Sequence, residues 1–448
     1  MVAGRWSTHP LLARAAGSRL AIALAIGALA DVASGQGAPT TGPMEPLFGV
    51  RALALVTRAT STPRGRTLTE GYLTQPVIMG EAALGRFRAR GTLNLEGLTL
   101  QRGELAVGSW GEGFVDRRHP HAYVHELLIG ADADMRVAHA SLFAGRGFVP
   151  FGSDDPMVRP FVSFPVDHHL AQILERLVLV GGVRAGPLLG EAATFNGDEP
   201  IDPSTLPLAR RFADSWAVRG TLIGDHIGAP WAGAELTASY AMVRSPERRD
   251  GRGMDQQKLH VGVRTEGDMG PFTRYAMIEW ARTDDLDRGR VLYTFSALLG
   301  EIAICRGGAG LAVRVERSDR PEEERLRDLF RSPRPATDVS ILGITRWTTT
   351  TAAMNLPAIA SGFVGAVPFV EVAHIGVMRT TAAIFDPALL YGADPMWRIA
   401  AGARIGIGSR HDRMGRYGAA ATMMQTMATK PTPHARHDVG QHRGRCFS

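Results

Sequence analysis

Cysteine and lysine are both scarce in this chain of 448 residues. Only two cysteines occur, Cys305 and Cys446, and they lie far apart, which excludes a framework of several disulfides. Only Lys258 and Lys430 are lysines among 50 basic residues, and the formal net charge is a modest +6. The arginine bias therefore indicates a compositional trait rather than a basic binding patch, and no nucleic-acid partner is expected.

Catalytic motifs are also missing. The chain has no G-x-S-x-G motif, no phosphate-binding P-loop and no Cys–His pair in a plausible setting. The glycine-rich piece 307–310 falls in an expected turn and lacks the spacing of a phosphate loop. We therefore expect that the protein is not an enzyme and has no catalytic residues.

Long apolar runs are few. Leu20–Ala30 is an uninterrupted apolar run that follows a basic start and precedes small residues. It is too short to span a bilayer, which takes about 20 apolar residues. This order predicts a secretory signal peptide over residues 1–35, cleaved between Ser34 and Gln36, with a retained anchor helix as the alternative. The protein is therefore expected to be secreted.

A second stretch, Trp347–Val370, lacks charge and has to be weighed as a membrane helix. Pro357 and Pro368 would break such a helix, and the four threonines Thr348–Thr351 favour strands. We interpret this stretch as two strands joined by a turn.

The dominant pattern is alternation of apolar and polar residues over segments of about ten residues. In 258–266, Leu259, Val261 and Val263 share one face, and charged residues occupy the other. Segments 232–243, 310–317 and 396–408 behave alike. Soluble strands average about five or six residues, whereas membrane-spanning strands run about nine to eleven. The length and number of these segments, together with secretion, favour a transmembrane barrel.

The predicted fold is all-β, a single antiparallel transmembrane β-barrel of about 14 strands, with 16 as the alternative. Gaps between the segments alternate between short and long, as periplasmic turns and outer loops do. The even number places both barrel ends on the periplasmic side. Five tryptophans near expected strand ends, Trp347 among them, suit a membrane interface. The predicted strands are 71–80, 85–96, 134–145, 172–184, 187–196, 212–223, 232–243, 257–266, 272–283, 291–303, 309–317, 339–350, 362–374 and 396–408.

This interpretation divides the chain into four regions. After the signal peptide, residues 36–70 are expected to form a periplasmic lead-in, and 71–408 the outer-membrane barrel. A helical or irregular insert is expected near 110–134. Residues 409–448, rich in His and Arg, are expected to be a polar extension, periplasmic and partly disordered, although a further strand near 417–424 is an alternative.

Charged residues on the inward faces are candidates for lining a pore, because an arginine at the middle of the lipid face costs about 2–4 kcal/mol. These candidates are Lys258, Arg264, Glu266, Glu279, Arg314, Glu316, Arg398 and Arg404.

Two regions that break the alternation carry candidate sites. In 110–134, His121 and His125 are spaced to share one face of a helix, with His119 upstream and Glu126 adjacent. Imidazole and carboxylate together suit Zn or Cu, so a divalent metal is possible; hydrogen-bonded histidines in a cap or plug are the alternative.

The second region, Gly145–Glu175, has four prolines and the adjacent acids Asp154 and Asp155, which exclude regular structure. We expect an outer loop that folds inward and forms a constriction, or else a plain surface loop. His168 and His169 in this loop are further candidates for the metal site.

Three runs carry a resemblance to a known group of proteins: 116–126 (DRRHPHAYVHE), 147–176 (GFVPFGSDDPMVRPFVSFPVDHHLAQILER) and 320–335 (RPEEERLRDLFRSPRP). They resemble blocks of uncharacterised porin-like outer-membrane β-barrel proteins of environmental bacteria. The resemblance covers most of the mature chain and less of its last forty residues. It implies the bacterial outer membrane and a barrel architecture, and it carries no substrate and no catalytic residue.

The predicted function is a porin-like channel for passive or facilitated passage of small solutes, surrounded by outer-membrane lipid and either monomeric or homo-oligomeric. A metal-handling outer-membrane protein that uses the histidines is one alternative. A soluble periplasmic β-rich protein is the other, because alternation alone is also found in sandwiches.

Overall fold

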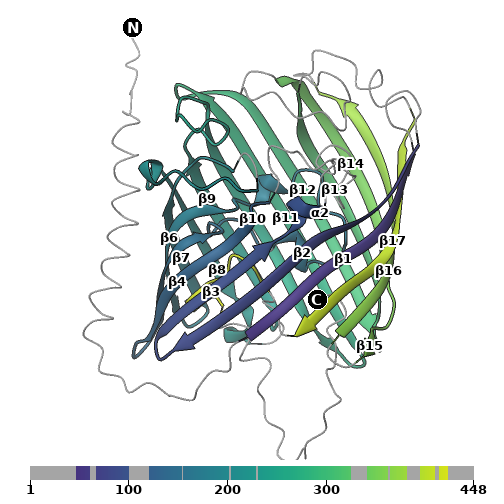
Figure 1. Cartoon of the computed structure of the whole chain (residues 1–448), viewed down its shortest axis with the longest axis horizontal. Helices are drawn as coiled ribbons and strands as arrows, with labels where there is room; N and C mark the ends of the chain where they lie inside the picture. The colour runs from purple at the N-terminus through teal and green to yellow at the C-terminus, as the bar shows by residue number, and fades with distance from the viewer. Residues whose placement is uncertain are drawn as a thin grey trace, which may run out of the picture.

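The computed structural model describes residues 47–60, 67–99, 121–153, 155–200, 203–228, 231–323, 341–361, 364–380, 394–408 and 413–421. They form one antiparallel sheet of 17 strands. Sixteen of them follow one another around a ring, which closes where β17 pairs with β1 from Gly49↔Gly408 to Thr60↔Trp397. The remaining strand, β15, pairs only with the start of β16 (Figure 1). The predicted signal peptide lies outside the described residues.

The strands are β1 (Leu47–Thr60), β2 (Leu68–Leu84), β3 (Phe87–Asn94), β4 (Val124–Asp134), β5 (His139–Gly147), β6 (Arg176–Ala185), β7 (Leu188–Phe195), β8 (Ser215–Ile223), β9 (Ala234–Val243), β10 (Asp255–Met269), β11 (Phe272–Asp287), β12 (Arg290–Arg306), β13 (Ala309–Glu323), β14 (Ile341–Asn355), β15 (Ile359–Ser361), β16 (Val364–Arg379) and β17 (Met396–Gly408). The helical pieces are α2 (Glu96–Thr99) and the 3-10 turns η2 (Pro156–Val158), η3 (His168–Ala171), η4 (Ala209–Arg211), η5 (Gly224–His226) and η6 (Gly418–Ala420). Among the described residues, no helix is long and apolar enough to cross a membrane.

Short turns gather at one end of the barrel, and most long connections lie at the other. Two residues suffice between β2 and β3, β6 and β7, β10 and β11, and β12 and β13. In the last of these turns Gly307 and Gly308 both have positive φ, +58° and +85°, as a tight hairpin turn of this type requires. Both β1 and β17 have their free ends at this short-turn end, as the alternating gaps predicted. One exception is the tight turn between β11 and β12, which lies at the long-loop end.

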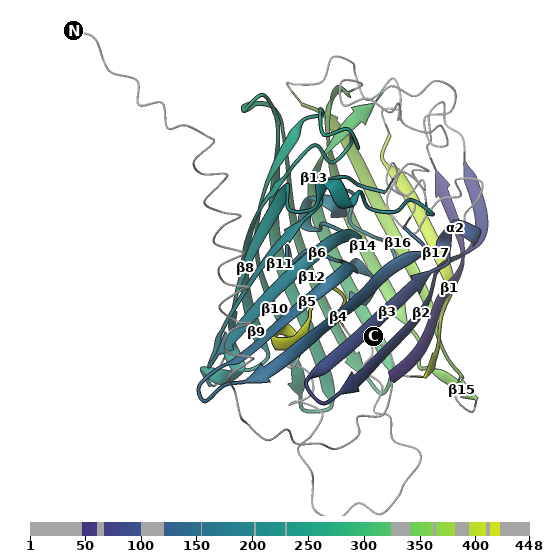
Figure 2. The ribbon, with the colours of Figure 1, turned by 60° about the vertical axis from the view of Figure 1, so that its left-hand side comes forward.

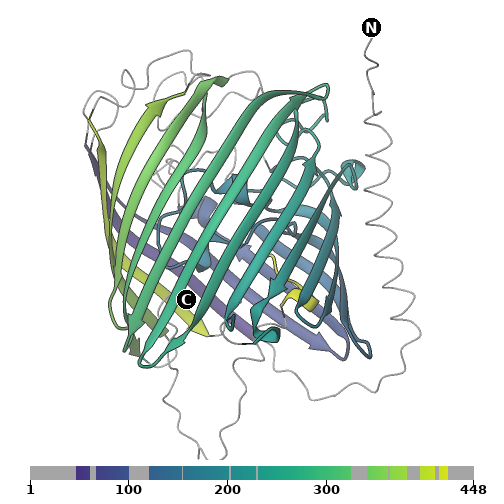
Figure 3. The same ribbon diagram turned by 180° about the vertical axis from the view of Figure 1, so that it is seen from behind.

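The barrel wall is uneven in height. Strands β10–β14 have 15 to 17 residues, whereas β3–β9 have 8 to 11. At about 3.3 Å per residue, the tall wall extends well beyond the low one. Figure 3 shows the long strands along the back, and Figure 2 shows the shorter, strongly tilted strands β3–β9. The connections after the shorter strands therefore have room to enter the barrel.

The two faces of each strand differ as the alternation predicted. Leu259, Val261 and Val263 on β10 are exposed, whereas Lys258 and His260, which alternate with them, are buried. The same contrast is seen on β13 and β17. Because the ring leaves no sheet edge and its outer face is apolar, the wall meets the requirements of a strand-built membrane span.

Fourteen ring strands match the predicted segments, although their bounds differ by several residues, and two were missed. The predicted count of 14 is wrong, and the alternative of 16 ring strands is confirmed. The stretch 347–370 contains parts of the strands β14 and β16, as predicted, and also the short strand β15 between them, which was not predicted.

The first missed strand is β1, which falls in the stretch that we expected to be a lead-in. Its inward face carries the apolar Leu53 and Leu55, which pack against Val162 and Phe369. Its outward face is apolar too, and Val56 is exposed there. Because residues 52–56 are apolar on both faces, the middle of β1 has little alternation to detect.

The second missed strand is β4, which falls in the expected helical insert. The helix prediction is wrong for 124–134; residues 110–120 lie outside the described part. A β-bulge interrupts the alternation of β4, because Thr92 pairs with Glu126 and Leu93 with Val124, which leaves His125 as the extra residue.

Two segments fill much of the lumen. The first is the connection from Phe148 to Glu175 between β5 and β6, here called the inward segment; Asp154 within it is not described. Its apolar side chains pack against β1, β16 and β17 through Val162, against β11–β14 through Phe161, and against β11, β12 and β14 through Leu170. Contacts with strands on several sides require that the inward segment lie inside the ring.

The second is 413–421, here called the C-terminal segment. It is a correction to the expected periplasmic extension, because its described residues lie inside the barrel against β3–β5, β8 and β9 (Figure 2). Its residues 418–420 form a 3-10 turn rather than a further strand. Met414 packs with Phe148, Met157 and Leu174 of the inward segment, so the two segments share one core.

Candidate functional site

The inward charges of the wall form the first part of the candidate site. All eight predicted pore-lining residues alternate with outward apolar residues on β10, β11, β13 and β17. Six of them are buried: Lys258, Glu279, Arg314, Glu316, Arg398 and Arg404. The other two, Arg264 and Glu266, are partly exposed near the short-turn end and form an ion pair with each other.

Glu279 joins the tall wall to the inward segment. Its carboxylate accepts hydrogen bonds from Ser153 Oγ at 2.5 Å and from Arg159 Nη2 at 3.0 Å. It also lies 3.1 Å from His260 Nε2 on the neighbouring strand. A buried carboxylate with this many donors is well satisfied, and removing it would leave the buried Arg159 with less compensation.

A second set of wall charges holds the backbone of the inward segment. Arg314 Nη1 donates to the carbonyl of Ser163 at 2.8 Å, and Glu316 Oε1 accepts from the backbone N–H of Val166 at 3.0 Å. Arg404 Nη2 donates to the carbonyl of Pro160 at 2.9 Å. Backbone groups of an irregular buried segment need such partners, because no strand supplies them.

Arg398 and Lys258 act less directly. Arg398 Nη2 donates to Glu371 Oε1 at 3.0 Å, and the other oxygen of Glu371 accepts from the backbone N–H of Val162 at 2.9 Å. Lys258 Nζ donates to Thr283 Oγ1 at 2.9 Å. Five of the eight candidates thus hold the inward segment, directly or through one residue.

Asp155, one of the two predicted constriction acids, stabilises the inward segment through hydrogen bonds within it. It is buried, and its Oδ1 accepts the backbone N–H of Met157 at 2.7 Å, which caps the turn η2. Its Oδ2 accepts from Gln172 Nε2 at 3.3 Å, across the inward segment. Asp154 lies outside the described residues.

A small cavity separates the inward segment from the tall wall. Its lining combines Arg159, Asp167 and His168 of the segment with inward residues of β11–β13, including Glu279, Glu316 and Ser318. Apolar residues share this lining, Ala281 and Leu299 among them. On the low wall, Val149, Phe151 and Ile173 join the core with Tyr417.

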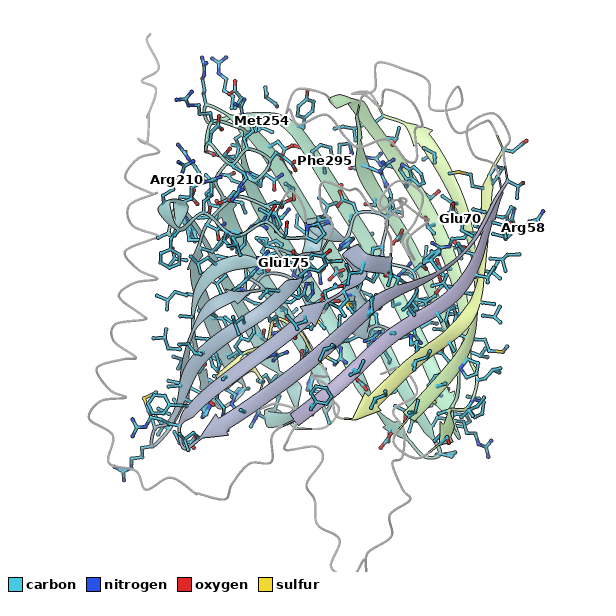
Figure 4. The ribbon with its side chains drawn as sticks, viewed as in Figure 1. Arg58, Glu70, Glu175, Arg210, Met254 and Phe295 are labelled. Carbon is cyan, nitrogen blue, oxygen red and sulfur yellow. The ribbon has the colours of Figure 1, made fainter. Side chains whose placement is uncertain are left out.

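A cluster of two histidines and one glutamate forms the second part of the candidate site. His121 Nδ1 lies 3.3 Å from Glu175 Oε1, and His125 Nδ1 lies 2.5 Å from the same oxygen. One ligand atom from each residue lies within 4.8 Å of the others. Figure 4 shows Glu175 where the front strands end, about halfway up the barrel.

The charges of this cluster depend on one another. Burial alone lowers the pKa of His121, but the hydrogen bond to Glu175 and the charges of Glu96 and Glu175 outweigh it and raise the pKa to about 9. Burial alone raises the pKa of Glu175, but His125 and His121 outweigh it and hold that pKa below its ordinary value. His121 and Glu175 therefore form an ion pair at neutral pH.

The predicted metal residues do not all meet. His121 and His125 are brought together, but by a bulged strand rather than a helix. Glu126 is held by Arg90 at 3.2 Å, and His168 contacts the rings of His169 and Phe164, while His119 is outside the described residues. Glu175 is the ligand candidate that sequence reasoning missed.

No family model and no curated protein matches this chain. Solved structures with a similar fold include an anion-selective porin from Comamonas acidovorans, at 9% identity and a TM-score of 0.45, with 82% of this chain and 99% of that chain covered. Another is a loop-deletion mutant of OmpT, an outer membrane protein of Vibrio cholerae, at 10% identity and a TM-score of 0.42, with 81% and 98% covered. A third is OpdO of Pseudomonas aeruginosa, at 9% identity and a TM-score of 0.37, with 82% and 98% covered. At identities this low, the solutes and activities of those proteins do not transfer to this chain.

Proposed function

We propose that this protein is a narrow channel of the bacterial outer membrane for small hydrophilic solutes. The observation that carries the proposal is the closed ring of 16 strands with apolar residues outside and charged residues inside. Such a wall is stable in lipid, because every backbone group is paired around the ring and the charges avoid hydrocarbon. An interior built from charged side chains suits water and polar solutes.

The bore of this channel is set by the inward segment. It has apolar contacts with the low wall and with the tall wall. Beside the tall wall, a small cavity carries the charged residues Arg159, Glu279 and Glu316 together with apolar residues. We place the solute path on that side. Inward residues of both signs line it, so a strong preference for one ion charge is not expected.

Single-channel recording in planar bilayers tests the proposal, using the refolded full-length protein. We expect small conductance steps from the native protein, and larger steps when residues 149–174 are replaced by a short Gly/Ser linker. A heat-modifiability gel shows beforehand that each variant is folded.

The matched control shortens the connection between β9 and β10 at residues 246–253, which contacts the β7–β8 connection instead of the wall charges. This control should keep the native conductance. Folded protein that never conducts, with or without its inward segment, would overturn the channel proposal and leave the barrel fold untouched.

A further inference from the structure

The two histidines and the glutamate lie near the starts of β4 and β6, at the long-loop end of the low wall. His121 precedes β4, His125 is the bulged residue near its start, and Glu175 is the last residue before β6. Bulges re-aim side chains, and this one lets the neighbours His125 and Glu126 both face the interior. Glu126 accepts a hydrogen bond from Arg90, and His125 contacts Glu175 instead.

Neighbouring groups orient the candidate ligands of the cluster. The backbone N–H of Ala122 donates to Glu175 Oε2 at 2.8 Å, which orients the carboxylate so that Oε1 points to both imidazoles. On the far side of the His121 ring, Nε2 lies 3.8 Å from Glu96 Oε2. A carboxylate behind a histidine is the usual outer support of a metal-binding imidazole.

Two further observations show that the cluster is under constraint. Nε2 of the fully buried His125 has no hydrogen-bond partner among the described residues, although buried polar atoms nearly always have one. Glu175 has a φ of +57°, which is uncommon for a residue other than glycine and is typical of functional positions. Both observations concern ligand candidates.

We propose that His121, His125 and Glu175 bind one divalent metal ion of the zinc class. Two imidazoles and one carboxylate suit zinc, and they leave a fourth position for water. The side chain of His121 is 18% exposed, so the ion has access from its side, whereas His125 and Glu175 are buried. The bound ion ties the end of the inward segment to β4.

Binding requires one small movement. Zinc ligands lie about 2.0–2.1 Å from the ion, so His125 Nδ1 and Glu175 Oε1 have to separate to roughly 3.3 Å around a tetrahedral ion. They are 2.5 Å apart in the structure, whereas His121 Nδ1 is already 3.3 Å from Glu175 Oε1. An imidazole binds zinc only through a deprotonated nitrogen, so the hydrogens on the Nδ1 atoms have to leave as the ion enters.

The test titrates Zn²⁺ into EDTA-treated, refolded full-length protein by calorimetry, and Co²⁺ by visible absorption. Histidines of the C-terminal tail can add background binding. The comparison is therefore between the amounts of Zn²⁺ that the native protein and each variant bind. We expect His121→Ala to lose one equivalent of bound Zn²⁺, and Glu175→Gln to bind that equivalent at least about 10-fold more weakly.

His139→Ala is the matched control. His139 also pairs with a carboxylate, Asp134 Oδ1 at 2.7 Å, but no third ligand joins that pair among the described residues. This variant should keep native stoichiometry and the native Co²⁺ spectrum. Equal Zn²⁺ stoichiometry and affinity in native protein, His121→Ala and Glu175→Gln would overturn the metal site.

The half-buried His121 is replaced in preference to the fully buried His125, and heat-modifiability verifies folding of each variant. Metal binding is read without any measurement of conductance. The metal proposal and the channel proposal can therefore fail separately.

Discussion

The hydroxyl of Tyr417 donates a hydrogen bond to Glu126 Oε1 at 3.0 Å, which joins the C-terminal segment to strand β4 inside the barrel. The same hydroxyl accepts the backbone N–H of Phe148 at 2.8 Å, where the inward segment begins. One phenol thus connects the wall and both segments that fill the lumen. Its burial and the nearby Glu126 charge raise its pKa, so it remains a donor at all ordinary pH values.

Removing that hydroxyl should loosen the C-terminal segment. Tyr417→Phe keeps the ring but leaves the N–H of Phe148 without this acceptor, which costs about 1–3 kcal/mol. We expect trypsin to cleave after Arg413 and Arg416 sooner than in the native protein, because both arginines are buried there. Mass spectrometry of the fragments follows the cleavage. Tyr240→Phe, which alters a tyrosine on the wall strand β9, is the control, and equal cleavage rates in all three proteins would contradict the role of Tyr417.

Removing Glu279 should weaken the inward segment on the tall-wall side. Glu279→Ala takes the carboxylate from Ser153, Arg159 and His260. Leaving Arg159 buried with less compensation costs about 3–5 kcal/mol. We expect a lower unfolding midpoint in urea and a larger channel conductance.

Glu266→Ala is the control for this variant, because Glu266 is an inward carboxylate of the adjacent strand that pairs with Arg264. It should change both quantities less. A Glu279→Ala protein with native conductance and native stability would show that this contact does not hold the segment.

The lipid-facing belt predicts a depth-dependent cost for arginine. Ile278 is outward and exposed near the middle of β11, whereas Met269 is outward at the short-turn end of β10. Ile278→Arg should destabilise the barrel by about 2–4 kcal/mol and Met269→Arg by about 0–1 kcal/mol. Urea unfolding in vesicles measures both. Equal costs for the two variants would mean that the belt does not face hydrocarbon as described.

Acid should destabilise the protein through His168. Burial, followed by the positive charge of His121, lowers the pKa of His168 from 6.5 to about 4. The unfolded chain therefore binds more protons than the folded protein between these values, and stability falls as the pH drops through that window. His168→Phe keeps an aromatic ring against Phe164 and His169 but cannot take up a proton.

We expect native protein to lose more stability than His168→Phe between neutral pH and about pH 4.5, measured by urea unfolding. Parallel losses in the two proteins would show that His168 titrates normally.

Tertiary structure decided which tryptophans meet lipid. Trp397 is outward and exposed at the start of β17, in agreement with an interfacial position. Trp347 also lies in a strand, but its side chain is fully buried inside the barrel, and its Nε1 donates to Thr345 Oγ1 at 2.9 Å. Its expected interfacial role is wrong. The sequence around both residues alternates, and only the closed register decides which side faces out.

The sequence by itself determined the barrel and its inward charges. Lipid outside and polar groups inside impose a period of two on each strand, and that period is readable without neighbours. It identified fourteen ring strands and placed Glu279, Arg314 and Arg404 on the inner face. It failed at β1, where residues 52–56 are apolar on both faces, and at β4, where the bulge at His125 interrupts the period.

Only the tertiary structure decided what those inward charges touch. Arg314 and Ser163 are 151 positions apart, and His125 and Glu175 are 50 apart, so no local spacing connects them. They meet because closing the ring brings distant strands around one lumen, into which the inward segment folds. An alternating pattern specifies a face, whereas the partner across the lumen depends on how the whole wall closes.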